Sequence, residues 1–153
     1  MAASTKEFVS VLNDLIEVSK DGEQGFRESA QAIKDQQLRG LFENYSMQRG
    51  KFAAELQTEV TRIGGEPEKS GSAAGALHRG WINLKKAISG GSDHAILEEA
   101  ERGEDAAVKS YREALTKDLP SDLQEIVRKQ YAAVLEAHNS IRSLRDSMTP
   151  LHS

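Results

Sequence analysis

The stretch G-G-E-P-E-K-S-G-S-A-A-G-A-L-H-R-G-W-I-N-L-K-K-A-I-S-G-G-S, residues 64–92, interrupts a helical pattern that covers most of the chain. Glycines lie on both sides of one apolar stretch, Leu77 to Ile88, which contains the single tryptophan, Trp81. Glycine and proline end helices, whereas the apolar stretch is typical of a short helix. The segment therefore predicts a long connection that carries a short helix over residues 76–88.

Two long helices are predicted before this segment, because apolar residues recur there at steps of three and four, the period of an α-helix. The first covers residues 4–34, and the second covers 36–63 and ends at Gly64 and Gly65. The apolar positions are Phe8, Val9, Leu12, Leu15, Ile16, Phe26, Ala30 and Ile33, followed by Leu38, Leu41, Tyr45, Phe52, Leu56, Val60 and Ile63.

Two more long helices are predicted after the segment. We expect Asp93 to cap a helix over residues 93–117 that Pro120 ends, and a last helix over 121–147. The apolar positions are Ile96, Leu97, Ala100, Ala107, Val108, Tyr111 and Leu115, followed by Leu123, Val127, Tyr131, Val134, Ile141 and Leu144.

The connection lengths predict how the helices are arranged. Short joints near residues 35 and 119 make each helix pair antiparallel, while the long middle segment can travel the length of the bundle. Short, long, short is the ferritin-like order. We therefore expect an all-α protein, a ferritin-like four-helix bundle with a long crossover carrying a short fifth helix, and one domain over residues 1–153.

The charge and hydropathy of the chain disfavour nucleic acids and membranes as partners. Acids and bases are interleaved along the chain, the net charge is −4, and no basic run is present that would attract nucleic acid or anionic lipid. No segment approaches the roughly 18 apolar residues of a membrane span, and the N-terminal residues lack the pattern of a secretory signal. We expect no nucleic-acid or membrane partner and a cytoplasmic location. The absence of cysteine excludes disulfides, thiolate zinc sites and cysteine nucleophiles.

One polar residue interrupts the apolar stripe of each long helix. The four residues are Glu23, Gln48, Glu104 and His138. At ~1.5 Å of rise per residue, all four lie near the middle of the bundle. We therefore expect them to meet there.

Glycines also occur inside the predicted helices, where each costs about 1 kcal/mol relative to alanine. Close approach of two helices, or room for the crossover to pack across the first and third helices, would explain them. We expect Trp81 to anchor the crossover to the bundle. The glycines are Gly22, Gly25, Gly40, Gly50 and Gly103.

Two stretches carry a family resemblance, Gly-Ala-Leu-His-Arg-Gly-Trp at residues 75–81 and Glu-Arg-Gly-Glu-Asp-Ala-Ala at 101–107. Over most of its length the chain resembles the ferritin-like superfamily, and within it a bacterial four-helix-bundle family catalogued as a domain of unknown function. Metal-loaded ferritin-like proteins take one Glu from each of two helices and a Glu-x-x-His pair from each of the other two. The resemblance implies that Glu23 and Glu104 are the single carboxylates.

The paired positions depart from the family pattern, because they read Gln48-x-x-Lys51 and Leu135-x-x-His138. Two divalent metals need several negative ligands, so we do not expect a full di-metal centre. Our leading hypothesis is a metal-free polar network in which Lys51 pairs with Glu23 or Glu104.

Two alternatives remain open at the centre. One is a single iron, manganese or zinc ion on Glu23, Glu104 and His138, with Glu101 as a substitute for Glu104. The other is that some of these side chains reach the surface.

The sequence contains no catalytic triad, phosphate-binding loop or nucleotide-binding turn, so we expect no catalytic residue and no cofactor. The leading expectation is a non-enzymatic, uncharacterised bundle with a degenerate di-metal centre, and the resemblance suggests a role in stress. The alternatives are a metal-binding protein and a structural module that forms a homo-oligomer or binds a partner through its helix faces or Trp81.

Overall fold

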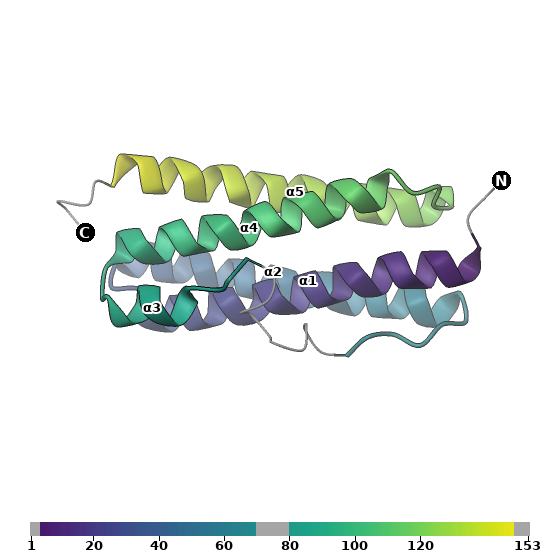
Figure 1. The fold of residues 1–153 in the computed structure, drawn as a ribbon, viewed down its shortest axis with the longest axis horizontal. Coiled ribbons are helices and arrows are strands. Elements are labelled where there is room, and N and C mark those ends of the chain that lie inside the picture. Colours follow the sequence, from purple (N-terminus) through teal and green to yellow (C-terminus); the bar gives the residue numbers. More distant parts are fainter. Residues whose placement is uncertain (1–3, 70–79, 149–153) are drawn as a thin grey trace.

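The computed structural model describes residues 4–69 and 80–148. Within these ranges the chain is entirely helical or loop, without strands, and its long helices lie side by side as a bundle (Figure 1). The helices are α1 (Thr5–Ala32), α2 (Gln36–Arg62), α3 (Leu84–Ser89), α4 (Asp93–Leu115) and α5 (Ser121–Ser147). The prediction of an all-α bundle is confirmed.

The four long helices begin and end within two residues of their predicted bounds. The short helix differs: α3 begins at Leu84, whereas a helix over 76–88 was predicted. Gly80 has a φ of +93°, a left-handed conformation that a right-handed helix cannot include. Residues 76–79 of that prediction lie outside the described residues.

Polar side chains accept hydrogen bonds from the free backbone amides at the N-terminal ends of the long helices α1, α2 and α4, and a glycine ends α2. Ser4 caps α1, Asp35 caps α2, and the positive φ of Gly64 ends α2. The cap of α4 is Ser92, whose hydroxyl accepts from the Ala95 amide at 3.2 Å, so the expectation that Asp93 caps this helix is wrong. The Asp93 carboxylate instead accepts the backbone amides of residues 34 and 35, at the turn between α1 and α2.

The helices form two antiparallel pairs, α1 with α2 and α4 with α5 (Figure 1). Each pair is joined by a short turn, while the C-terminal end of α2 and the N-terminal end of α4 lie at opposite ends of the bundle. Helix α1 also packs against α4. The predicted order of short, long and short connections is therefore observed. None of the helices in the described part of the chain has the length and apolar character needed to cross a bilayer.

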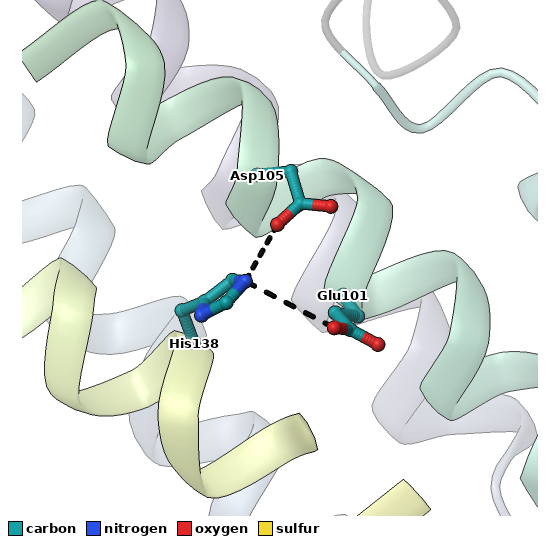
Figure 2. A group of neighbouring side chains, drawn as sticks. All are labelled: Glu101, Asp105 and His138. Carbon is teal, nitrogen blue, oxygen red and sulfur yellow. Dashed lines mark hydrogen bonds and ion pairs between the residues drawn. The ribbon is translucent and has the colours of Figure 1, made fainter.

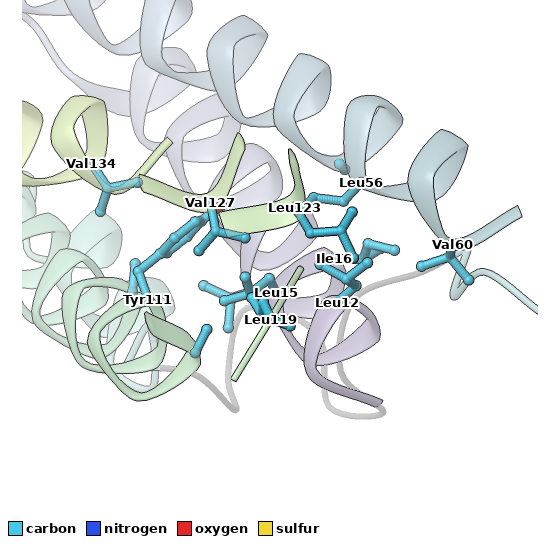
Figure 3. Packing of buried hydrophobic residues seen from close by; sticks show 14 of the residues in the cluster. Leu12, Leu15, Ile16, Leu56, Val60, Tyr111, Leu119, Leu123, Val127 and Val134 are labelled. Carbon is cyan, nitrogen blue, oxygen red and sulfur yellow. The ribbon is translucent and has the colours of Figure 1, made fainter. Parts of the chain in front are cut away.

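Two apolar clusters make up the core. The first joins the N-terminal part of α1, the C-terminal parts of α2 and α4 and the N-terminal part of α5 (Figure 3). The second joins the opposite ends of the same helices and includes Phe26, Phe42, Trp81 and Ile141. Buried polar residues separate the clusters along the chain: Arg49 falls between Phe42 and Ala53 on α2, and Glu104 falls between Ala100 and Ala107 on α4. This polar layer lies about halfway along the bundle, and its buried charged residues make it a candidate functional site.

Trp81 anchors the segment before α3, as predicted, and its side chain is 1% exposed. The indole ring lies against the backbone of α1 at Gly25 and of α4 at Gly103. A methyl group at Gly25 would lie 2.5 Å from Cδ2 of the ring, and one at Gly103 would overlap the ring. The two glycines therefore give the crossover the room that the sequence indicated.

Candidate functional site

An ion pair between Arg49 and Glu104 occupies the polar layer. Both side chains are about 1% exposed, and the guanidinium donates to both carboxylate oxygens, with Nη2 2.6 Å from Oε2. Arg49 Nε donates to Gln48 Oε1 at 3.3 Å, and the guanidinium carbon lies 5.3 Å from the centre of the Phe26 ring. The pair therefore has the bidentate geometry of a strong charge-assisted interaction.

The surroundings of Arg49 favour its charged form. Burial alone would lower the pKa of the guanidinium, but the charge and hydrogen bonds of Glu104 oppose this, and the pKa of Arg49 is raised. A buried ion pair of this kind adds little net stability compared with apolar residues of the same volume. Removing one partner is costly, because the other charge stays buried without compensation.

Local sequence explains why Arg49 reaches the core. It lies seven residues after Phe42 and seven before Leu56, which places all three on one face of α2. Across from it, Gly22 on α1 has no side chain, and a methyl group there would lie 3.4 Å from Cγ and Nη1 of Arg49. The long side chain therefore fills the space that this glycine leaves.

Lys51 and Glu23 do not form the buried pair that the sequence suggested. Lys51 is exposed, because it follows Arg49 by two residues, about 200° around the helix axis. The expectation that Lys51 pairs with Glu104 is wrong, since Arg49 does so. Glu23 is partly exposed, lies 3.5 Å from Lys20 Nζ and packs over Gly50, where an added methyl group would lie 2.6 Å from Glu23 Oε2.

A chain of hydrogen bonds crosses the bundle beside this pair and takes one side chain from each long helix. Tyr111 on α4 donates to Gln130 Oε1 on α5 at 2.6 Å and lies 3.3 Å from the Ser19 hydroxyl on α1. Gln130 Nε2 donates to Glu55 Oε1 on α2 at 2.7 Å. Burial raises the pKa of Tyr111 from 10.0 to about 12, so its hydroxyl stays protonated, and able to donate, at a higher pH than that of an exposed tyrosine.

A second group of polar side chains lies between α4 and α5 (Figure 2). His138 Nε2 is 2.5 Å from Asp105 Oδ1 and 4.0 Å from Glu101 Oε2. Arg142 Nε donates to Glu101 Oε2 at 3.0 Å, and Arg145 pairs with Glu101 Oε1. Glu101, Asp105 and His138 each offer one atom to a set whose members lie within 4.8 Å of one another, which is suitable for a metal ion.

The polar residues that we expected to meet at one centre therefore belong to two separate groups. Glu104 and Gln48 interact with Arg49, whereas His138 interacts with Asp105 and with Glu101, the residue expected to substitute for Glu104.

Arg49 and Asp105 were not recognised from the sequence, although a signal existed for each. Arg49 continues the seven-residue spacing of Phe42 and Leu56. Asp105 follows Glu101 by four residues, on the same face of α4.

A comparison with protein families matches residues 7–117 to the family described as "Domain of unknown function (DUF2383)". The chain belongs to this family. The DUF2383 match includes Arg49, Glu101, Glu104 and Asp105 and ends before α5, which contributes His138. A comparison with curated proteins finds no match.

Proposed function

We propose that this DUF2383 protein is a non-enzymatic bundle of ferritin-like topology, in which a degenerate di-metal centre holds the four helices in register. The ion pair between Arg49 and Glu104 is the observation that carries this proposal. Two antiparallel helix pairs, joined by a connection between opposite ends of the bundle, support the topology.

The chemistry of the central side chains disfavours a metal among them. Both oxygens of Glu104 accept from the guanidinium of Arg49, and Gln48 accepts from the same group. A permanent positive charge at this position repels a second cation. Arg49 therefore takes the role that we expected of Lys51. The alternative of one iron, manganese or zinc ion on Glu23, Glu104 and His138 loses its central ligand, because Glu104 is committed to Arg49.

The central groups are also poorly placed for catalysis. Arg49, Glu104 and Tyr111 are each about 1% exposed, so a substrate would reach them only if the bundle opened. Their polar atoms bond to one another and to neighbouring helices. We infer that this layer specifies which helix faces meet, a role known for buried polar residues in some bundles.

The setting of the protein is proposed from the family resemblance alone. We place it in the bacterial cytoplasm, in a role related to stress, without a nucleic-acid partner. Self-association through the outer helix faces remains a prediction. The route through Trp81 is disfavoured, because that side chain is 1% exposed.

Elemental analysis of a double variant tests this function. The protein would be loaded anaerobically with Fe²⁺ or Mn²⁺ and desalted, alongside Arg49→Met/Glu104→Leu, which replaces the pair by apolar side chains. We expect the two proteins to fold and to retain the same amount of metal, well below one ion per chain. Near-stoichiometric metal in the natural protein that is lost from the double variant would contradict the proposal.

A further inference from the structure

The group formed by Glu101, Asp105 and His138 lies apart from the Arg49–Glu104 pair, and we propose that it binds one zinc ion. This inference goes beyond the proposed function, which concerns the centre of the bundle. Two ligands come from adjacent turns of α4 and the third from α5 (Figure 2). A bound ion would therefore link the two helices of the C-terminal pair.

His138 directs one ring nitrogen at both carboxylates. Its Nδ1 lies 3.2 Å from the amide oxygen of the adjacent Asn139, while its Nε2 lies 2.5 Å from Asp105 Oδ1 and 4.0 Å from Glu101 Oε2. One nitrogen and two carboxylate oxygens therefore converge on one point, where a bound metal ion would replace the direct contact between His138 and Asp105.

Two of the three ligands are buried and the third is exposed to solvent. The side chains of His138 and Glu101 are 9% and 7% exposed, and packing holds them in place. The side chain of Asp105 is 58% exposed and can take up an ion from solvent. A hollow of about 410 Å³ lies beside Asp105, His138, Asn139 and Arg142 and leaves room for water to complete the shell.

Zinc suits this set of donor atoms. Imidazole nitrogen and carboxylate oxygen bind it at about 2.0–2.2 Å, so neighbouring ligands in a tetrahedral shell lie roughly 3.4 Å apart. The distances from His138 Nε2, 2.5 Å to Asp105 and 4.0 Å to Glu101, lie on either side of that value. A movement of about 1 Å by the exposed Asp105 side chain, with a small shift of Glu101, satisfies both.

The arginines beside Glu101 act as outer partners of the site. Arg142 and Arg145 each bond to one carboxylate oxygen, and each oxygen keeps a further lone pair for a metal. Hydrogen bonds of this kind hold a ligand in its orientation. Unlike the buried Arg49, these two arginines have side chains that are 55% and 30% exposed, so solvent screens their charges. The charges still lower the affinity for a divalent ion, and zinc binds nitrogen and oxygen donors more tightly than Mn²⁺ or Fe²⁺.

Isothermal titration of the full chain with zinc chloride tests the site, with Asp105→Asn and His138→Ala as the disruptive variants. His94→Ala is the matched control: His94 lies on α4, 3.3 Å from the carboxylate of Glu98, and belongs to no three-residue group of possible metal ligands among the described residues. Circular dichroism checks that each variant is folded. Asp105→Asn keeps the inference testable if His138→Ala does not fold, because the Asp105 side chain is largely exposed.

We expect one zinc ion per chain in the natural protein and in His94→Ala, and at least about tenfold weaker binding in the other two variants. Absence of saturable binding in the natural protein would overturn the site. Unchanged affinity in Asp105→Asn, or loss of binding in His94→Ala, would also overturn it.

Discussion

Inside the bundle, the guanidinium of Arg49 on α2 donates hydrogen bonds to both carboxylate oxygens of Glu104 on α4, with Nη2 2.6 Å from Oε2. The two residues lie 55 positions apart in the sequence, on opposite sides of the long crossover. Because the pair is almost completely buried, its two charges depend on each other. The pair also links α2 with α4, although α2 packs mainly on α1 and α4 mainly on α5.

Gly103→Ala should destabilise the protein, because the added methyl group would overlap the buried indole of Trp81. We expect the free energy of unfolding to fall by about 1–3 kcal/mol, the usual cost of overpacking a core. Urea denaturation followed by circular dichroism measures this change.

Gly40→Ala is the matched control, since no atom outside its own helix lies within 4 Å of the added methyl group. Here the higher helix propensity of alanine should raise the free energy of unfolding, by up to about 1 kcal/mol. The role given to Trp81 would be wrong if both alanine variants shifted the stability in the same direction.

Tyr111→Phe should cost about 1–3 kcal/mol, because it removes the donor to Gln130 and leaves that buried oxygen without its partner. Tyr131→Phe provides a comparison on α5: the Tyr131 hydroxyl accepts from Arg112 near the surface, and its loss should change stability by less than about 0.5 kcal/mol. Equal losses in urea denaturation would argue against the hydrogen-bond chain across the bundle.

Alkaline pH should weaken the protein partly through Tyr111. Its pKa is raised from 10.0 to about 12 in the folded state, so this contribution to stability is complete below pH 10. Between pH 10 and about 12 the unfolded chain loses the proton first, and the contribution, about 2–3 kcal/mol, is lost. The loss over this range should be smaller by that amount in Tyr111→Phe, and identical pH profiles for the two proteins would contradict the raised pKa.

The long helices were predictable, because their apolar positions repeat every three or four residues and clear end signals follow them. The bounds of α5 agree with the prediction at both ends, and Gly64 ends α2 as expected. The start of α3 was not predictable from apolar content alone. It depends on the left-handed backbone of Gly80 and on the packing of Trp81 between two helices.

The position of the candidate site along the bundle was predictable from the sequence, but the residues that form it were not. A polar residue on each apolar stripe indicated a polar layer near the middle, yet Gln48, Arg49 and Lys51 are all polar and lie within four positions. Which of them faces inward depends on a rotation of α2 by a fraction of a turn, and the space over Gly22 decides it in favour of Arg49. The pairing of His138 with Asp105 likewise depends on how α5 is rotated against α4.

The central claim is that Arg49 and Glu104 hold the bundle as a mutually dependent pair, and a double-mutant cycle in urea denaturation tests it most directly. Arg49→Met and Glu104→Leu should each lower the free energy of unfolding by about 3–5 kcal/mol, because each leaves one buried charge unpaired. The double variant should be close to the natural protein, and exposed Lys51→Met should change little. Single variants that cost less than about 1 kcal/mol each, with additive effects in the double variant, would contradict the claim.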